Sequence, residues 1–370
     1  MYWLIVPVAI YSVGIFTLWL ILQRKHEEDQ PAVPGNMPVS VVIAARNEEK
    51  TIATLLDNLA QQDYPGDLLE VIVVNDNSTD RTPIVVSEFI SRKRQHPAVN
   101  IRLIYNPFRG KKSAVRYAIE KAAGELILMT DADCSVGPGW VSAYAAYFAS
   151  GNADMIVGEV YQKPGRGFAS YFGSFEFSAL QAITESAIRA GRPVMCSAAN
   201  MAIRKDIYLR HAGDLRNDLA SGDDIFLLHA VKRSGGIIMH IGGGAAAAVT
   251  AGAVTVAALL RQRARWASKA YYYSDAATLT LAAATAACNA AVAAAAAVSV
   301  ISVKYLPLLG LLYSIRLIPD LLITYRNFKK REEHPPLFLF IFSELIYPFY
   351  FITVALLTLL PCSRQFRTRD

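Results

Sequence analysis

Two aspartates separated by one residue, Asp131 and Asp133, follow the apolar run ELILMT. If that run is a strand, its alternation directs both carboxylates to the same side. Two carboxylates so placed hold a hard divalent cation, with phosphate oxygens completing its coordination shell. The structural alternative for this short pattern is a cap for the helix predicted over Pro138–Ser150.

Two further groups favour a nucleotide. Asp76 closes the apolar run EVIVVND and is a candidate acceptor for ribose or base hydrogens, whereas Ser78 or Thr79 after it would cap the next helix. Lys111 follows Gly110 at the start of a predicted helix, where backbone N–H groups and the ammonium attract an anion. The alternative for the lysine is an ordinary solvated basic turn.

The remaining candidates lie later in the chain. Asp224 precedes the helical run IFLLHAVKRSG and is either a general base for a hydroxyl or a helix cap. Gln262, Arg265 and Trp266, in the segment QRARW, have the i, i+3, i+4 spacing of one helix face. The alternative is a basic helix on anionic lipid, with Trp266 and Tyr271–Tyr273 as interface anchors.

Other chemistries lack their signatures. The first apolar run is followed by neither GxGxxG nor GxxxxGK[ST], and no Gly-x-Ser-x-Gly elbow is present. The four cysteines form no CxxC pair, which removes support for a zinc ribbon. The basic residues are spread along the chain without an RNA-binding aromatic motif, so nucleic acid is not an expected partner.

The elements that must position these residues alternate between strand-like and helical patterns from Pro38 to about Gly236. Continuous apolar runs separated by helices predict βαβ units and a buried parallel sheet. Polar clusters follow three of the runs, beginning at Arg46, Asn75 and Asp131. Ligands of such sheets bind at the carboxyl ends of the strands, so the three clusters predict one site.

The composition indicates a membrane protein. Hydrophobic residues make up 53% of the 370 and charged residues only 18%, against about 25% in soluble domains, which argues against a fully soluble enzyme. Residues 1–22 carry no charge, are long enough to cross a bilayer and lack the features of a cleaved signal peptide. We expect two or three more membrane segments within residues 278–361, the last of which spans or re-enters near Pro348.

Basic residues at the ends of these segments predict the orientation. Arg24 and Lys25 follow the first segment, and the basic stretch Arg326–His334 separates the last two, so both should face the cytoplasm. Arg316 and Asp320 lie four residues apart within a candidate span, where they can pair on one face. The net charge of +6 suits an anionic ligand as well as an anionic membrane face.

The ordered segments VSVVIAARNEE, VIVVNDNSTD, GKKSAVRYAI, MTDADC, SAANMAIRK, SGDD and QRARW resemble the membrane-bound family-2 glycosyltransferases, which include cellulose, chitin and hyaluronan synthases and ceramide glucosyltransferase. The resemblance extends from Val39 to Trp266 and to the flanking membrane segments. It implies an α/β fold of the GT-A (nucleotide-diphospho-sugar transferase) type, with the catalytic domain over residues 38–250 and an interfacial helix over residues 255–275.

The resemblance also implies roles for individual residues. Asp131 and Asp133 match the DxD motif that binds Mg²⁺ or Mn²⁺ and the donor diphosphate, and Asp224 matches the presumed general base. The nucleotide contacts of the family correspond to Glu48, Asp76 and Lys111, and its acceptor and diphosphate region corresponds to Gln262, Arg265 and Trp266. Departures from the family pattern occur at Asn75, Asn77, Arg116 and Gly222-Asp223.

The implied function is inverting sugar transfer from a nucleotide-diphosphate sugar, with a UDP-sugar favoured, to a hydroxyl of a lipid or saccharide at the bacterial inner membrane. One alternative is a processive polysaccharide synthase coupled to export. About four membrane segments are few for a self-contained channel, which favours the non-processive version. A non-catalytic membrane module with the same fold is the alternative of another class, although its expected loss of carboxylates is not seen at Asp131, Asp133 and Asp224.

Overall fold

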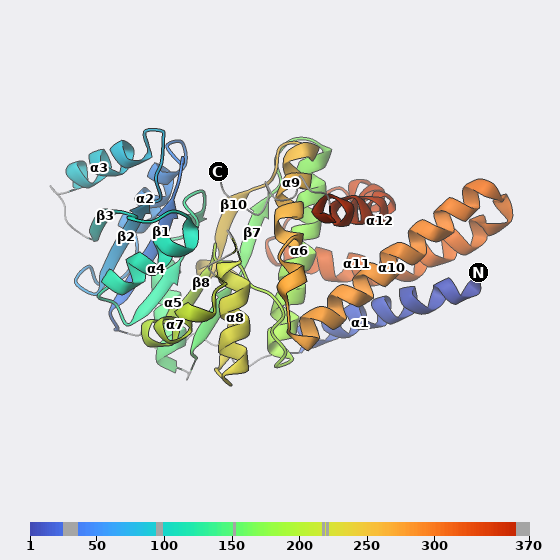
Figure 1. The fold of residues 1–370 in the computed structure, drawn as a ribbon, viewed down its shortest axis with the longest axis horizontal. Coiled ribbons are helices and arrows are strands. Elements are labelled where there is room, and N and C mark those ends of the chain that lie inside the picture. The colour runs from blue at the N-terminus through green and yellow to red at the C-terminus, as the bar shows by residue number, and fades with distance from the viewer. Residues whose placement is uncertain (25–35, 94–98, 151–152, 217–218, 220–221, 360–370) are drawn as a thin grey trace.

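The computed structural model describes residues 1–24, 36–93, 99–150, 153–216, 219 and 222–359. A domain built on a β-sheet lies at one end of the molecule, and long apolar helices extend from the other end (Figure 1). The amino terminus lies at the tip of these helices, far from the sheet. The two regions therefore separate the candidate chemistry from the apolar segments, as the sequence predicts.

Seven strands form the main sheet. They are β1 (Val39–Ala45), β2 (Leu69–Asn75), β3 (Asn100–Tyr105), β4 (Leu126–Met129), β6 (Met155–Gly158), β8 (Met201–Arg204) and β9 (Ile238–Ile241). Their spatial order is β3-β2-β1-β4-β8-β6-β9, and β8 runs antiparallel to both of its neighbours. The expectation of a wholly parallel sheet is therefore wrong at β8, a four-residue strand too short for a sequence pattern to define.

Helices cover both faces of this sheet. One face carries α2 (Ile52–Ala60), α3 (Thr82–Lys93) and α5 (Trp140–Ser150), and the other carries α4 (Lys111–Lys121), α7 (Lys205–His211) and α8 (Asp223–Arg233). Central strands sandwiched in this way are buried on both sides, which explains why β1 and β2 read as continuous apolar runs.

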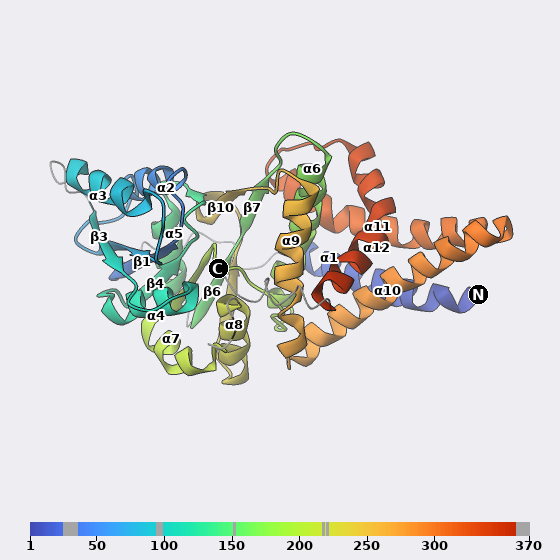
Figure 2. The same ribbon diagram turned by 45° about the horizontal axis from the view of Figure 1, so that its top comes forward.

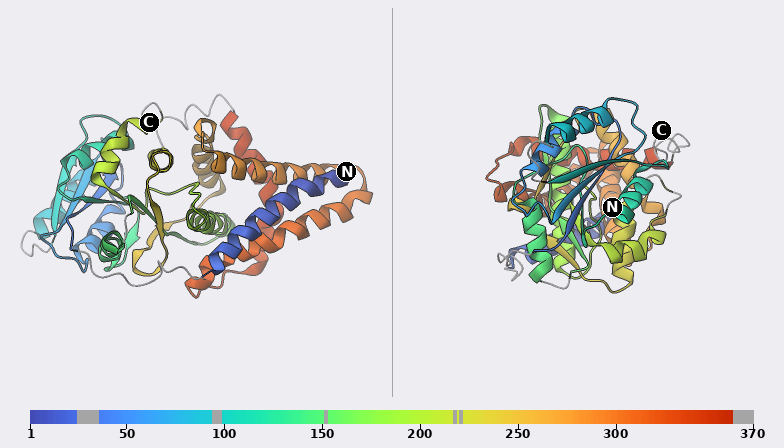
Figure 3. Two further views of the ribbon diagram at one scale, coloured as in Figure 1. Left: turned by 90° about the horizontal axis from the view of Figure 1, so that it is seen from below. Right: turned by 90° about the vertical axis from the view of Figure 1, so that its left-hand side faces the viewer.

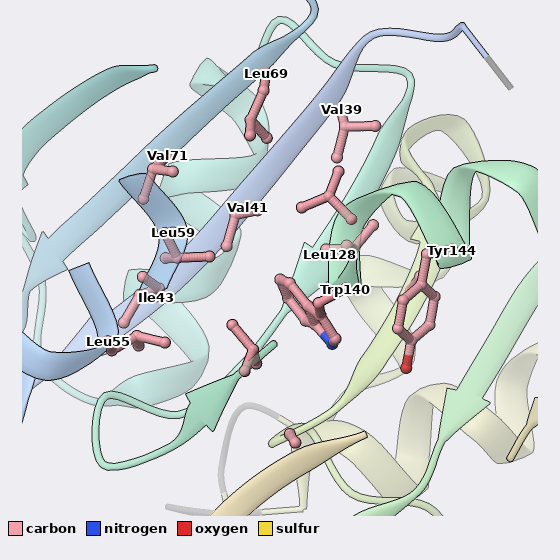
Figure 4. Close-up of a cluster of buried hydrophobic side chains, with 14 of the residues drawn as sticks. Val39, Val41, Ile43, Leu55, Leu59, Leu69, Val71, Leu128, Trp140 and Tyr144 are labelled. Carbon is pink, nitrogen blue, oxygen red and sulfur yellow. The ribbon is translucent and has the colours of Figure 1, made fainter. Parts of the chain in front are cut away.

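Figure 4 shows the core between the sheet and the first set of helices. In α2, Leu55 and Leu59 lie on the same face and pack on the β1 side chains Val41 and Ile43. The core also holds Trp140, whose indole Nε1 donates to Asn200 Oδ1 at 2.8 Å. This bond satisfies a polar atom that would otherwise be costly to bury.

A smaller sheet joins this domain to the apolar helices. It consists of β5 (Ser135–Val136), β10 (Ala248–Ala251) and β7 (Val160–Lys163), in the order β5-β10-β7. Beside it stand α6 (Phe168–Arg189) and α9 (Val256–Ala267), which lie between the main sheet and the apolar helices in Figures 1 and 2. The QRARW segment therefore lies where the two regions meet.

Among the described residues, four helices are long and apolar enough to cross a membrane. They contain α1 (Ile5–Gln23), α10 (Ala276–Ile301), α11 (Leu306–Lys330) and α12 (Leu337–Leu359). The hairpin considered near Pro348 is wrong, because α12 continues through this proline as one helix. Figures 1 and 2 show α12 lying crosswise to α1 and α10, and Figure 3 shows α1, α10 and α11 extending together.

A polar cluster ties these apolar helices together. Arg316 of α11 donates to Asp320 Oδ2 at 3.1 Å, to Glu344 Oε2 of α12 at 2.9 Å and to Asn289 Oδ1 of α10 at 3.1 Å. Tyr11 of α1 donates to Asp320 Oδ1 at 2.8 Å. The predicted pairing of Arg316 with Asp320 is confirmed, and its wider network fixes four helices at one point.

The basic ends of the apolar helices come together beside the sheet domain. Arg24, at the end of α1, offers its carbonyl oxygen to Arg189 Nη1 at 3.4 Å. Arg326 and Lys330 lie at the corresponding end of α11 and surround the same cavity as Arg24. Lys25 lies outside the described residues. The sequence expected these basic segments on one side, and the fold places Arg24 and the α11 end there together.

Candidate active site

Asp76 follows β2 and is held by the neighbouring loops. Its backbone N–H donates to Ala45 O at 2.8 Å, and its Oδ1 accepts from Gly110 N–H and from Asn106 Nδ2, both at 2.9 Å. The residue is only 2% exposed, and within the described part of the chain its Oδ2 has no hydrogen-bond partner. A fixed carboxylate with one unsatisfied oxygen is suited to accept hydrogen bonds from a ligand hydroxyl or amide.

Glu48 follows β1 on the adjacent loop. Its backbone N–H donates to Thr82 Oγ1 at 2.7 Å, and its Oε2 accepts from Thr51 Oγ1 at 2.9 Å. Asn47 before it has a φ of +58° and accepts the Thr79 N–H on its side-chain oxygen at 2.8 Å. The loops after β1 and β2 are thus bonded to one another, which brings two of the three predicted polar clusters together.

Lys111 connects the nucleotide candidates with the paired aspartates. It begins α4 directly after Gly110, whose φ of +101° is in the region that favours glycine. The Lys111 ammonium forms an ion pair with Asp131 Oδ1, while the Gly110 N–H is bound to Asp76. One turn at the start of α4 therefore contacts both Asp76 and Asp131, as expected for groups around one anion.

Asp131 and Asp133 lie in a turn rather than in a strand. The strand β4 ends at Met129, and the Cys134 N–H donates to Asp131 O at 3.0 Å across the turn. The expected strand alternation is therefore wrong, although the two carboxylates remain close enough to interact. Burial raises the pKa of Asp133, the charge of Asp131 raises it further, and a hydrogen bond from Thr250 opposes the shift.

Asp131 and Asp133 suit a cation whose coordination shell is completed by oxygens of a second molecule. Two adjacent carboxylates suit a hard divalent cation. In the described ranges no group of three or more His, Cys, Asp or Glu is arranged to hold a metal. A cation at Asp131 and Asp133 would thus need further oxygens, and the diphosphate of a ligand supplies such oxygens.

The QRARW segment forms the last turns of α9 and packs against this turn. Trp266 contacts the cluster that contains Cys134 and Phe177, and its ring centre is 6.1 Å from that of Phe177. Gln262 Oε1 accepts from Arg263 Nη1 at 2.7 Å. Arg265 is half-buried on the same helix. Trp266 is therefore packed against a cluster that includes Cys134, the residue after Asp133.

Arg263, which the sequence analysis did not single out, is the centre of this segment. It is 4% exposed, and its Nε donates to Glu176 Oε2 of α6 at 2.7 Å. The same carboxylate oxygen accepts from Tyr350 Oη of α12 at 3.1 Å. The only sequence signal for this role was the position of an arginine inside the motif, directly after Gln262.

Asp224 lies in the first turn of α8, and its partner was also missed. Its Oδ1 is 3.9 Å from Lys269 Nζ, and its side chain is 20% exposed. Gly222 before it has a φ of +93°, and a Cβ there would lie 2.8 Å from Lys269 Cδ. Glycine thus permits Lys269 to approach, and this lysine follows Trp266 by three residues.

Trp266, in the last turn of α9, packs against the cluster that includes Cys134, and Lys269, just after this helix, lies near Asp224. Lys111 forms an ion pair with Asp131, and the N–H of the preceding Gly110 donates to Asp76. Glu48 lies on the loop bonded to the segment after Asp76. The arrangement brings together a buried acceptor carboxylate, a lysine and two adjacent carboxylates, while Asp224 on α8 lies near Lys269 just after α9.

Family models match this chain over most of its length. The model for glycosyl transferase family 2 matches residues 40–211, and the model for glycosyl transferase family group 2 matches residues 126–360. The chain belongs to glycosyl transferase family group 2.

Individual relatives are similar over shorter segments. A beta-monoglucosyldiacylglycerol synthase of Synechocystis sp. is 31% identical over 137 residues, which are 35% of this chain and 28% of the relative. A probable glycosyltransferase of Bacillus subtilis, YdaM, is 43% identical over 123 residues, 32% of this chain and 28% of the relative. These alignments span little more than a quarter of each relative's length.

One solved structure is similar along nearly the whole chain. The mannosyltransferase PcManGT from Pyrobaculum calidifontis, solved with GDP-Man and Mn²⁺, has a TM-score of 0.65 and 21% identity. The match covers 96% of this chain and 99% of that one. It confirms the predicted α/β fold of the GT-A type, and apolar helices precede and follow this domain in the sequence.

Proposed function

We propose that this protein transfers a sugar from a nucleotide-diphosphate sugar to a hydroxyl of a lipid or saccharide acceptor at a membrane, with inversion at the anomeric carbon. The observation that carries the proposal is the chain of contacts from Asp76 through Gly110 and Lys111 to Asp131. It supports the proposal because a buried carboxylate, a lysine ammonium and a second carboxylate, groups suited to a nucleoside, a phosphate and a metal, lie along one short path.

The donor is bound by groups on the carboxyl ends of the strands. Asp76 accepts from the nucleoside through its unsatisfied Oδ2, and Glu48 contributes a carboxylate on the neighbouring loop. Lys111 lies close to Asp131 and supplies positive charge to the diphosphate. A UDP-sugar remains our first choice, while PcManGT was solved with a GDP-sugar, so both nucleotides belong in a screen.

Asp131 and Asp133 would hold Mg²⁺ or Mn²⁺ together with oxygens of the donor. When bound, such an ion neutralises the negative charge that develops on the leaving diphosphate. The raised pKa of Asp133 reflects burial and the adjacent Asp131, and a bound cation would offset this repulsion. PcManGT was solved with Mn²⁺, which makes Mn²⁺ the natural first test.

Asp224 removes the proton from the acceptor hydroxyl as the hydroxyl oxygen attacks the anomeric carbon. The bond from the anomeric carbon to the diphosphate oxygen breaks, and the diphosphate leaves with the electron pair. Lys269 Nζ lies 3.9 Å from the Asp224 carboxylate and is its cationic neighbour. Gln262, Arg265 and Trp266 border the acceptor and diphosphate region from α9.

A membrane location explains where the acceptor is met. One of the candidate spans, α12, packs against α9, and the basic ends of α1 and α11 face the sheet domain. Under the positive-inside rule these basic ends support a catalytic domain in the cytoplasm, at the inner membrane if the source is a bacterium. A lipid hydroxyl would therefore reach Asp224 from the membrane side.

The experiment that tests the proposal is a donor screen. The purified protein would be incubated with UDP- and GDP-sugars, with and without Mn²⁺ and a lipid extract, and release of nucleoside diphosphate would be measured. We expect release that requires one donor, the metal and the extract together. Product length on a gel then separates single transfer from polymerisation. Absence of turnover with every donor would favour the non-catalytic alternative.

A further inference from the structure

A cavity of about 780 Å³ lies away from the candidate active site, at the ends of α1 and α11 that face the sheet domain. Its walls come from Gln23 and Arg24 of the α1 end, the end of α11 from Arg326 onward, the loop Gly242–Gly244, and the strands β7 and β10 of the small sheet. Its volume is in the range of ligand sites, about 300–1,000 Å³.

The cavity and the active site use opposite faces of the small sheet. Val249 of β10 lines the cavity, whereas the next residue, Thr250, bonds to Asp133. Successive side chains of a strand point to opposite faces. The cavity is thus separated from Asp131 and Asp133 by the β5-β10-β7 sheet, and a ligand there would not occupy the donor site.

Positive charge dominates the lining. Five cationic side chains line the cavity: Arg24, Arg189, Arg326, Lys330 and Arg331. Two buried carboxylates, Glu159 and Glu185, lie among them, so cations are in excess. Such an excess, partly shielded from water, attracts an anion more strongly than the same charges spread over an open surface.

The cationic side chains are also held in place. Arg326 donates to both oxygens of Glu185, at 2.6 and 2.8 Å, and Arg189 and Lys330 bind the same carboxylate at 2.8 and 3.3 Å. Arg331 pairs with Glu159 and stacks over the Tyr161 ring at 4.2 Å. Groups fixed before a ligand arrives lose little conformational entropy when they bind it.

The rest of the lining suits an amphiphile. Leu22, Tyr161 and Val249 contribute apolar surface beside the cations. A Cβ on Gly244 would meet no atom within 4 Å, so the glycine loop leaves open space at the wall. Because α1 and α11 are candidate membrane spans, their ends place the cavity at the level of lipid headgroups.

We propose that this cavity binds the phosphate group of an anionic membrane lipid, with the cations on the phosphate and the apolar wall against the glycerol and upper acyl carbons. The bound lipid joins α1, α6 and α11 to the small sheet from the side opposite the donor site. The site is separate from sugar transfer and is tested without measuring activity.

The test uses the full chain in a neutral detergent and three probes: dihexanoylphosphatidic acid, dihexanoylphosphatidylcholine and inorganic phosphate. Each probe is titrated while binding is followed by calorimetry and by the midpoint of thermal unfolding. We expect phosphatidic acid to bind and raise the midpoint, and the other two probes to bind at least about tenfold more weakly. The lipid assignment is overturned if inorganic phosphate binds as well as phosphatidic acid.

Variants localise the effect. Lys330 is 34% exposed and makes a single bond of 3.3 Å to Glu185, so Lys330→Gln changes little else. We expect it to weaken phosphatidic acid about tenfold, and Lys330→Arg to retain binding. Lys329→Gln, one residue away and outside the cavity lining, is the matched control. The proposed site is refuted if Lys329→Gln and Lys330→Gln lose the same affinity for phosphatidic acid, or if neither loses any.

Discussion

The Arg263 guanidinium lies 4.2 Å from the centre of the Trp266 ring and stacks on it while its Nη1 binds Gln262. One buried arginine thereby fixes two of the three side chains that the QRARW pattern singles out. Its other bond, to Glu176, connects this segment to α6 and, through Tyr350, to α12. The orientation of the motif thus depends on the packing of an apolar helix.

We predict that Arg263→Lys lowers kcat about tenfold to a hundredfold, because a lysine can pair with Glu176 but cannot also hold Gln262 and stack on Trp266. The unfolding midpoint should change little, since Glu176 keeps a cationic partner. Steady-state kinetics checks this against Arg261→Lys, an exposed position on the same helix. If both variants have the same kcat, Arg263 does not position Gln262 and Trp266 for catalysis.

Asp224→Asn should reduce kcat by about 10²–10⁴, the range expected for loss of a general base, while donor affinity stays near that of the parent chain. Asp223→Asn is the matched control, because Asp223 precedes Asp224 in the same helical turn. Rates of diphosphate release and calorimetric donor binding measure the two effects. Normal turnover by the Asp224 variant would refute its assigned role.

Asp131→Asn and Asp133→Asn should each weaken Mn²⁺-dependent binding of the nucleoside diphosphate by about a hundredfold or more. Mutation of residues that only hydrogen-bond to a metal ligand typically lowers metal affinity about 10- to 100-fold. Loss of a direct ligand should therefore have at least the larger effect. Titration calorimetry with and without Mn²⁺ gives the result directly. Chelation of the metal from the parent chain should abolish turnover, and re-addition of Mn²⁺ should restore it. Full affinity of both variants for the Mn²⁺ complex would exclude the metal site.

Stability should fall on acidification. Burial lowers the pKa of His240 to about 4, against an ordinary value of 6.5. The neutral ring therefore stabilises the fold above pH 6.5, and this contribution is lost as pH falls from 6.5 through 4. The difference between these two pKa values corresponds to at most about 3 kcal/mol in the free energy of unfolding. Unfolding midpoints measured across this range should decline, and His240→Leu should flatten the decline; an unchanged slope would contradict the assignment.

Glu185 adds a second acid-sensitive step. Burial alone would raise its pKa, but hydrogen bonds from Arg326 and nearby positive charge lower it to about 2, from an ordinary value of 4.5. Its stabilising effect is present above pH 4.5 and is lost as pH falls through 2. The midpoint should therefore keep falling below pH 4.5 even in His240→Leu. A plateau there in that variant would show that the Arg326–Glu185 pair contributes little.

Much of the site could be predicted because it follows strands. Asp76 and Asp131 come after buried apolar runs, and neighbouring strand ends must meet at one edge of the sheet. The turn at Asp131–Cys134 could not be predicted, since it depends on where β4 ends. Arg263 and Lys269 were missed for a different reason: their roles arise from the contacts of α9 with α6 and of the segment after α9 with α8, and long-range packing leaves no local pattern.

Detection of the transferred sugar is the most direct test of whether this protein is an inverting glycosyltransferase. The parent chain, Asp131→Asn and Asp224→Asn would each be incubated with a ¹³C-labelled nucleotide-sugar, Mn²⁺ and a lipid extract, and the product analysed by mass spectrometry and NMR. We predict a glycosylated product of inverted anomeric configuration from the parent chain and little product from either variant. A retained configuration, or equal product from the Asp224 variant, would contradict it.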